Sequence, residues 1–531
     1  MLNVERCKTI LMRPPTPAIS IAIIALTCFA IYFNALFNGF VYDDISQILR
    51  NPWIKDFKYA TEIFFNNVWA FAGKTTNYYR PLPQIIYMSA YHVFKLKAWG
   101  FHLINILFHT CTSIVVFFTV SKLMKDSPLL PLPSNLYPSL IAAMIFATHP
   151  IHTEAVTYIA GIADLSYSFF YILSFYLYIN STRLFEYRYV LSLLSFFLAT
   201  LCKEPALTLP CIIIAYDVAR NFSKKENIIS PYSLARYSLY FAIAGVYLII
   251  RFYALGSFAP VKNDLQITFY EYFINIFSLF SQYLEKLILP IQLNFYYIFH
   301  PISSPLTMKA VIAFLSVSVF SWFMFREFKK NGVVFIGMLF ILIPLLPAFY
   351  IPALSHGLKN SFAERYLYLP SFGFALLSAL LFTWVQFKKQ NLVKALSVIV
   401  VSLICLYSIG TISRNAVWKD NYTLWLDTVS KSPDGDIPHG SLGYALIQKG
   451  RIDEAIRELQ IALSLNADFA EAHNNLGVAY RDKGLIDAAI EEFSAAYMLN
   501  SADPLFSRNL KETYEMQRLF NETRTRNKIA N

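Results

Sequence analysis

The sequence is poor in charge. Only 15% of its 531 residues are Asp, Glu, Lys or Arg, whereas an ordinary soluble domain carries roughly 25%. At the same time 56% of the residues are apolar and 17% are aromatic. This combination excludes an ordinary soluble domain and predicts an all-α protein that crosses a membrane many times.

Cysteine is also scarce, and no two cysteines have the spacing of paired metal ligands. The residues lie in or beside apolar segments, which argues against a disulfide framework and against a zinc site. We therefore expect no required cofactor and no resident metal, although help from a divalent cation is left open. The six residues are Cys7, Cys28, Cys111, Cys202, Cys211 and Cys405.

Positive charge is distributed in short clusters between the apolar runs. The formal net charge of +11 is typical of nucleic-acid binding only where the cations form one patch, so we expect no nucleic-acid partner. Short cytoplasmic loops retain Lys and Arg, so these clusters indicate topology. With Arg6, Lys8 and Arg13 inside, the C-terminus lies outside the membrane. The first apolar run is long enough to span, so we interpret it as an uncleaved helix.

Eleven apolar runs are long enough to cross a hydrocarbon core of about 30 Å. A twelfth segment, 269–290, contains Glu271, Glu285 and Lys286, and crossing there would move the basic cluster 326–330 outside. We therefore interpret 269–290 as an interfacial or re-entrant helix on the outer surface. The eleven predicted spans are 16–38, 100–121, 138–158, 164–181, 188–202, 205–219, 234–251, 308–326, 333–351, 366–386 and 392–411.

A repeat of 34 residues follows the last span. Gly443 matches Gly477 and Asn466 matches Asn500, which is the period of the tetratricopeptide repeat, abbreviated TPR. We predict full repeats at about 438–471 and 472–505, with a degenerate helix before them and a cap after them. The sequence thus divides into a membrane domain, 1–412, with an outer loop 39–99, and an extracytoplasmic TPR α-solenoid, 413–531.

The charges outside the basic clusters share one side of the predicted membrane. Asp43 and Asp44 open the first outer loop in "FVYDD", and the others end or begin spans on the same outer face. Charges near membrane depth are costly and normally face a cavity or a partner, so the convergence predicts one polar site at the outer boundary. The remaining candidates are Arg80, His149, His152, Glu154, Asp164, Lys203, Glu204, Arg251, Glu364 and Arg365.

Each motif has a purely structural alternative. An Asp-Asp pair at a helix end is commonly a solvated cap, and the adjacent Lys203 and Glu204 could form a surface ion pair of little value. One histidine of "HPIHTEA" could simply bond to a buried carbonyl, and the Arg and Tyr of "ERYLY" could anchor at headgroup level. These alternatives leave unexplained why all the groups share one face.

An outward-facing carboxylate and nearby cations suit a specific kind of chemistry. The carboxylate can act as general base toward an acceptor hydroxyl, and the cations can stabilise a phosphate leaving group. A lipid-linked sugar phosphate places its tail in the bilayer and its phosphate and sugar at the boundary. Candidate cations for the phosphate are Arg80, Lys203, Arg251 and Arg365.

In "FVYDD", "YRPLPQIIY", "FHLINILFH", "HPIHTEAVTYIAGIAD", "CKEPALTLP", "ERYLYLPSFGF" and the repeats, the chain resembles the GT-C type membrane glycosyltransferases. In particular it is similar to the transmembrane and TPR repeat-containing O-mannosyltransferases and their prokaryotic relatives. The resemblance implies a polyprenyl-phosphate sugar donor, inverting transfer and a base in the acidic first loop. By position, Asp43 is the expected base, and Asp44 orients it or the acceptor. Ile162 stands where relatives often have arginine.

Other functions remain open at this point. An oligosaccharyltransferase or ligase of preassembled glycans would share this architecture, and a non-enzymatic assembly factor would use the repeats to recruit partners. A transporter fits less well because the polar residues gather at one face. For the transferase, we expect mannose as the first candidate sugar and a protein or peptide acceptor that could bind in the TPR groove. A bacterial inner membrane with a periplasmic site is favoured over the endoplasmic reticulum.

Overall fold

The computed structural model describes residues 15–125, 136–224, 230–256, 268–330, 332–349 and 362–530. Over these ranges the chain is helical and forms no β-strand, as the sequence predicts. The predicted topology rests partly on Arg6, Lys8 and Arg13, and these residues, like Cys7 and the last residues of the predicted span 333–351, lie outside the described residues.

The chain divides into two compact units. The repeat unit contains Asn294–His300 and the residues from Lys419 onward, and the membrane unit contains the other described residues. The domain boundary predicted after residue 412 falls inside the last long helix of the membrane unit, which continues to Asn415, and the division lies after Trp418. The local sequence pattern gave no sign that Asn294–His300 belongs to the repeat unit.

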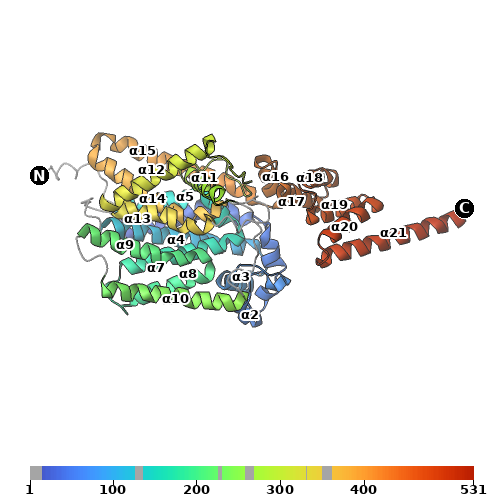
Figure 1. Cartoon of the computed structure of the whole chain (residues 1–531), viewed down its shortest axis with the longest axis horizontal. Coiled ribbons are helices and arrows are strands. Elements are labelled where there is room, and N and C mark those ends of the chain that lie inside the picture. Colours follow the sequence, from blue (N-terminus) through green and yellow to red (C-terminus); the bar gives the residue numbers. More distant parts are fainter. Residues whose placement is uncertain are drawn as a thin grey trace. The chain divides into compact units, whose positions relative to one another are not determined.

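The membrane unit is built from long apolar helices, many of which lie roughly side by side, with α2 and α3 at one end (Figure 1). Eight helical segments in the described ranges are long and apolar enough to cross a membrane. The other three predicted spans coincide with shorter helices, α5, α8 and α9. The helices are α1 Pro17–Tyr32, α2 Ala60–Phe65, α3 Pro81–Phe94, α4 Ala98–Lys125, α5 Leu136–Thr148, α6 Thr153–Thr157, α7 Ile162–Ile179, α8 Tyr187–Cys202, α9 Leu209–Lys224, α10 Pro231–Leu255, α11 Phe269–Ile288, α12 Met308–Lys330, α13 Gly332–Leu342, α14 Pro370–Lys388 and α15 Val393–Asn415.

Several helices begin where a side chain caps free backbone N–H groups. The Thr16 hydroxyl accepts from the Ile19 N–H at 3.3 Å, and Pro17 follows at the first helical position of α1. The Thr268 and Glu271 side chains form a capping box at the start of α11. Gly256 ends α10 with a φ of 71°, a conformation that glycine adopts without strain.

Helix interruptions at one end of the unit create the turns that carry the polar residues. The predicted span 138–158 is broken, because α5 ends at Thr148 and Pro150 cannot continue a helix. The chain turns there and resumes as the short α6. In the same way, the turn Glu204–Thr208 separates α8 from α9. These breaks place the candidate residues in turns, where their side chains are free to converge.

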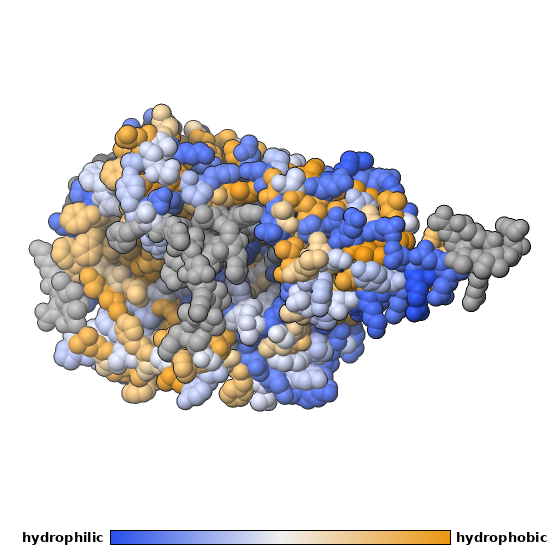
Figure 2. Space-filling model, turned by 45° about the vertical axis from the view of Figure 1, so that its right-hand side comes forward, coloured by the Kyte–Doolittle hydropathy of each residue, from blue (hydrophilic) through white to orange (hydrophobic). Residues whose placement is uncertain are grey.

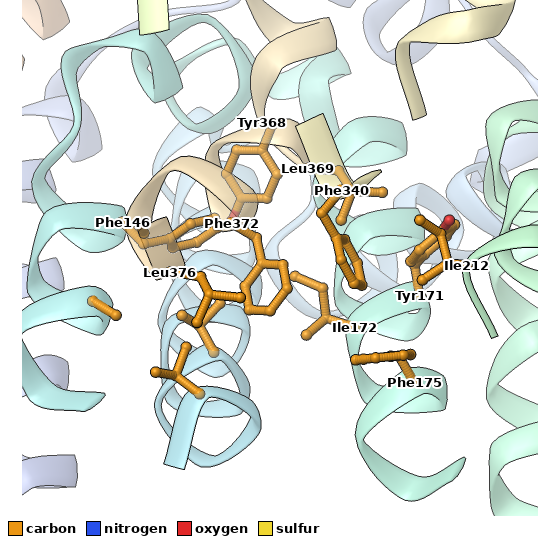
Figure 3. Packing of buried hydrophobic residues seen from close by; sticks show 14 of the residues in the cluster. Phe146, Tyr171, Ile172, Phe175, Ile212, Phe340, Tyr368, Leu369, Phe372 and Leu376 are labelled. Carbon is orange, nitrogen blue, oxygen red and sulfur yellow. The ribbon is translucent and has the colours of Figure 1, made fainter. Parts of the chain in front are cut away.

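The core of the membrane unit is a cluster of aromatic and aliphatic side chains from α5, α7, α9, α13 and α14 (Figure 3). Phe340 packs edge-on against Phe372, with ring centroids 4.5 Å apart, and against Phe175 at 5.1 Å. Edge-to-face pairs of this kind add to the gain from burial. The packing fixes the helices whose ends carry the candidate site.

The surface of the membrane unit is rich in hydrophobic residues, which spread over broad areas of the face shown in Figure 2. On α12, Phe314 and Trp322 are 60% and 59% exposed, and on α15 Val398 is 65% exposed. Exposed apolar area of this extent marks a membrane or protein contact surface. Together with the eight long apolar helices, it identifies an integral membrane protein.

The repeat unit consists of antiparallel helix pairs, as the 34-residue period predicts. Equivalent glycines allow close packing in each pair: a Cβ on Gly443 would lie 2.5 Å from the Leu459 Cγ, and one on Gly477 would lie 2.8 Å from the Phe493 ring. The helices are α16 Asn421–Lys431, α17 Asp436–Gln448, α18 Ile452–Leu465, α19 Ala470–Asp482, α20 Ile486–Leu499 and α21 Pro504–Ala530.

Candidate active site

The loop 39–99 is pinned by Asp44. This side chain is fully buried, and its Oδ2 accepts the Val41 N–H at 3.1 Å while its Oδ1 accepts the Ala160 N–H at 2.8 Å. Asp44 therefore ties the loop to the turn before α7. Because both of its oxygens are engaged by backbone N–H groups, Asp44 is suited to hold the loop in place and leaves Asp43 as the accessible carboxylate.

Asp43 is half-buried beside a cation and a phenol. Burial raises the pKa of the Asp43 carboxyl above its ordinary value, and the nearby Arg365 guanidinium, the Tyr158 hydroxyl and, more weakly, Lys74 act in the opposite direction. A carboxyl with a raised pKa is a stronger base once it has ionised. The surroundings of Asp43 therefore suit proton transfer from a hydroxyl.

Arg365 is oriented by a buried carboxylate. Glu154, on α6, is fully buried, and one of its oxygens pairs with the Arg365 guanidinium while the other accepts the Arg365 backbone N–H at 2.9 Å. Burial opposes ionisation of this arginine, but Glu154 more than compensates and raises its pKa. Arg365 thus keeps its charge while it lies close to Asp43.

Lys203 forms a second buried ion pair. Its Nζ lies 2.5 Å from the Asp164 Oδ1, and the same Nζ lies 4.6 Å from the centre of the Tyr366 ring. Burial lowers the pKa of Lys203 to about 8, Asp164 opposes this shift, and the nearby cations Arg80 and Arg365 add to it. The influence of both arginines shows that the cations gather in one region.

Glu204 joins two further cations. Its Oε2 accepts Arg80 Nη2 at 3.0 Å and its Oε1 accepts Arg251 Nη1 at 3.1 Å. Arg251 also donates to the Asn77 carbonyl at 2.7 Å, which links α10 to the outer loop. Burial opposes ionisation of Glu204, but Arg80 and Arg251 overcome this effect and lower its pKa.

The predicted residues that converge form a cluster of ion pairs. In this cluster the four cations Arg80, Lys203, Arg251 and Arg365 are paired with the three carboxylates of Glu154, Asp164 and Glu204. Asp43 lies beside the Arg365 end of this group. An arrangement of this kind can attract an anion such as a phosphate and can provide one ionisable base next to it.

Three predicted residues, His149, His152 and Glu364, are not part of the ion pairs described above. His149 is fully buried, with Nε2 bonded to the Leu287 carbonyl at 3.0 Å and Nδ1 accepting the Ile151 N–H at 3.2 Å. His152 is also fully buried and bonds through Nε2 to the Ser371 hydroxyl at 2.7 Å.

The two rings pack against aromatic neighbours, Phe146 and Tyr368 for His152 and Phe374 and Tyr407 for His149. The structure therefore does not bring these histidines to the cations. Glu364 is fully buried in the same short turn as Arg365.

The described residues contain no group of three or more His, Cys, Asp or Glu side chains that could hold a metal ion. Each carboxylate of the cation cluster, Glu154, Asp164 or Glu204, is instead paired with Arg or Lys. The carboxylates of this cluster therefore form ion pairs. The expectation that the site works without a metal stays a prediction.

Sequence reasoning named Tyr78 and Tyr79 as aromatic rings for the sugar but missed Tyr158. Tyr158 lies beside Asp43 and stacks on Trp418 with ring centroids 5.3 Å apart, and Tyr78 lies 4.5 Å from the Arg80 guanidinium. Tyr79 is fully buried and donates to the Phe64 carbonyl, so it has no exposed face for a ligand. Tyrosines beside the charged residues of the motifs were the available signal.

Comparison with known families identifies the repeats. Residues 443–484 match the family described as TPR repeat, and residues 470–503 match the family described as Tetratricopeptide repeat. The chain is also similar to the solved structure of ArnT from Cupriavidus metallidurans bound to undecaprenyl phosphate. The match covers 89% of this chain and 79% of the ArnT chain, with 12% identity and a TM-score of 0.40.

Curated relatives extend the similarity to most of the chain. Protein O-mannosyl-transferase TMTC3 of Mus musculus is 26% identical over 477 residues, which cover 83% of this chain and 50% of the relative. Protein O-mannosyl-transferase F38B6.6 of Caenorhabditis elegans is 28% identical over 448 residues, 83% of this chain and 62% of the relative. The chain thus spans about half the length of the mouse protein, and it is a distant relative of the protein O-mannosyl-transferases.

Proposed function

We propose that the protein is a membrane glycosyltransferase that moves a sugar from a polyprenyl phosphate to a protein hydroxyl. Mannose is the first candidate sugar, because the relatives bear the name protein O-mannosyl-transferase. The reaction takes place on the extracytoplasmic side, where the positive-inside pattern puts the first loop and the repeats. The observation that carries the proposal is the half-buried Asp43 beside Arg365, at the edge of a cation cluster.

Asp43 is the general base in this proposal. Its carboxylate takes the proton of the acceptor hydroxyl while the hydroxyl oxygen bonds to the anomeric carbon of the sugar. The bond between that carbon and the phosphate oxygen breaks, and the electron pair leaves with the phosphate. Attack opposite to the leaving group inverts the configuration at the anomeric carbon.

The cations stabilise the charge that develops on the leaving phosphate. Arg365 is held by Glu154 and Lys203 by Asp164, so both are positioned before the substrate arrives. Preorganised cations in a site of low water content contribute more than the same charges in bulk water. Arg80 and Arg251, joined by Glu204, extend the positive region along the outer loop.

The test uses purified protein in detergent with a panel of radiolabelled polyprenyl-phosphate monosaccharides and a periplasmic or secreted protein extract as acceptor. Asp43→Asn is compared with wild type, and Asp56→Asn, an exposed aspartate on the same loop, is the matched control. We expect Asp43→Asn to lose about 10²- to 10⁴-fold of the transfer rate, as for a lost general base.

Both variants should be expressed at the wild-type level and should fold. Equal transfer by wild type and Asp43→Asn would remove Asp43 as the base. Transfer of a preassembled oligosaccharide, with none of the monosaccharides accepted by wild type, would replace the proposal with an oligosaccharide ligase.

A further inference from the structure

Tyr42, the residue before Asp43, has an unusual backbone conformation. Its φ is 49°, in the left-handed region that residues with a Cβ adopt at a cost. Glycine or asparagine would occupy such a position with less strain. Strain at a bulky residue persists only where the surroundings enforce it, and it often marks a functional site.

Hydrogen bonds on both sides of Tyr42 hold its backbone in this conformation. Asp44 accepts the Val41 N–H, the Asp44 N–H donates to the Val41 carbonyl at 3.0 Å, and the Ile45 N–H donates to the Tyr42 carbonyl at 3.2 Å. Val41 and Asp44 are buried on either side of the turn, while the Tyr42 side chain is 41% exposed. The turn therefore buries its two ends and leaves Tyr42 and Asp43 as its accessible side chains.

The hydrogen bonds of the turn do not require a tyrosine at position 42. An exposed tyrosine at a membrane boundary can serve as an interfacial anchor, but an anchor could occupy a neighbouring position without strain. Tyr42 lies next in the chain to the candidate base and close enough to Tyr158 to influence it electrostatically. The ring is thus kept within the neighbourhood of the Asp43 carboxylate.

We propose that Tyr42 is a substrate-binding residue, and that its strained backbone presents the ring as a platform for the apolar C–H face of the donor sugar beside Asp43. This inference rests on the proposed function, since it requires a lipid-linked sugar at the cation cluster. Tyr42 selects for the sugar, whereas the cations bind the phosphate. The contributions of the two groups can therefore be separated by replacing the sugar with a methyl group, which keeps the single charge of the phosphodiester.

The experiment measures equilibrium binding of two phosphodiester lipids of equal chain length and equal charge, polyprenyl-phosphate mannose and the sugar-free polyprenyl methyl phosphate, to the full-length protein in detergent. The variants are Tyr42→Gly, Tyr42→Phe and Phe185→Gly. Phe185 is the matched control, because it also has a left-handed φ, 63°, is 81% exposed, and lies in the turn between α7 and α8. Thermal unfolding is recorded for every variant.

We expect wild type to bind the mannose lipid about five- to tenfold more tightly than the sugar-free lipid, which is the size of an aromatic stacking contact. Tyr42→Gly should erase this preference, keep its affinity for the sugar-free lipid, and unfold at the same or a higher temperature because strain is released. Tyr42→Phe and Phe185→Gly should retain the preference. If Tyr42→Gly does not fold, Tyr42→Asn, which also tolerates a positive φ, takes its place.

Each contrary result has a distinct meaning. An intact preference in Tyr42→Gly would overturn the platform, and a lower unfolding temperature in the same variant would assign Tyr42 to anchoring. Equal binding of both lipids by wild type would overturn the platform and leave the phosphate site of the proposed function standing. Binding of neither lipid would overturn both.

Discussion

Among single residues, Asp43, the proposed base, carries a stability cost that depends on pH. Burial raises its pKa, so between the ordinary value near 3.9 and the raised one the folded state binds a proton that the unfolded state has released. The free energy of unfolding therefore falls as pH rises through this window. We expect Asp43→Asn to remove that decrease and to unfold at a higher temperature than wild type at pH 7.

Thermal unfolding of both proteins in detergent from pH 4 to pH 7 checks the prediction. A parallel pH dependence in the two proteins would contradict it, because the ionisation of Asp43 would then contribute nothing to the difference. Asp56→Asn, an exposed change on the same loop, should leave the wild-type decrease in place.

If Lys203 binds phosphate as proposed, it should set an upper pH limit for that binding. Burial lowers its pKa to about 8, so the side chain loses its proton at a pH where Arg365 and Arg80 remain charged. We expect the affinity of wild type for sugar-free polyprenyl phosphate to fall severalfold between pH 7 and pH 9. Lys203→Arg should keep its affinity over this range, and a decrease of equal size in that variant would exclude Lys203 as the titrating group.

The sequence largely predicted which residues lie in the candidate site, but not which of them form ion pairs with each other. Charges at the ends of consecutive spans must share a face once the number of spans is right, and this brought Asp43, Arg80, Lys203 and Arg365 together. Local sequence could not show that Lys203 pairs with Asp164 instead of its neighbour Glu204. That choice depends on how α7 and α8 pack.

The positions of His149 and His152 could not be predicted, for a related reason. "HPIH" marks a helix break, and the pattern contains no information on which side of the turn each ring lies. Packing directs His149 toward α11 and His152 toward α14, away from the cations.

At the scale of helices, each of the two full repeats contains the same partly buried bond. His439 Nδ1 lies 2.6 Å from Glu458 Oε2, and 34 residues later His473 lies at the same distance from Glu492. Burial lowers the pKa of His439, but the bonds to Glu458 and to the Pro433 carbonyl outweigh burial and raise it. A raised histidine pKa stabilises the folded state below about pH 6.5, and this stabilisation is lost as pH rises through the folded pKa.

We therefore expect the repeat unit to unfold at lower temperature at pH 8 than at pH 6, and His439→Gln to reduce the difference. Thermal unfolding of the full-length protein, followed by circular dichroism, measures it. An unchanged pH dependence in His439→Gln would show that other groups produce the effect.

The helices themselves were more predictable than their interruptions. Hydropathy found every long apolar helix, because a segment in lipid must satisfy its own backbone bonds. It overlooked the buried charges inside two of the predicted spans, 234–251 and 205–219. Arg236, on α10, is buried, donates to the Ser181 hydroxyl at 2.8 Å and lies 4.0 Å from the Tyr178 ring centre. Asp217, on α9, accepts Tyr178 at 2.5 Å and Tyr237 at 2.8 Å.

For the molecule as a whole, the repeat unit includes a segment that the chain order separates from it. Asn294 donates to the Ser432 hydroxyl at 2.8 Å, the same hydroxyl donates to the Tyr296 carbonyl at 2.8 Å, and the Phe295 ring packs edge-on against Trp425 at 5.4 Å. Contacts between residues more than a hundred positions apart leave no periodic signal, so sequence patterns did not reveal this one. The segment Asn294–His300 owes its conformation to α16 and the turn after it.

Removing the repeats should therefore expose the segment 294–300, which lies far from them in the sequence. We expect a chain that ends at Trp418 to be cleaved within 294–300 by a trace of protease at least about tenfold faster than the full-length chain, because the backbone there loses its partners. A chain that ends at Asp503 lacks only α21 and keeps Ser432 and Trp425, so it should be cleaved there as slowly as the full-length chain. Mass spectrometry of the early fragments identifies the site. Equal protection in all three chains would mean that 294–300 is held by the membrane unit, and equal loss in both truncated chains would mean that its anchoring requires the whole stack of repeats.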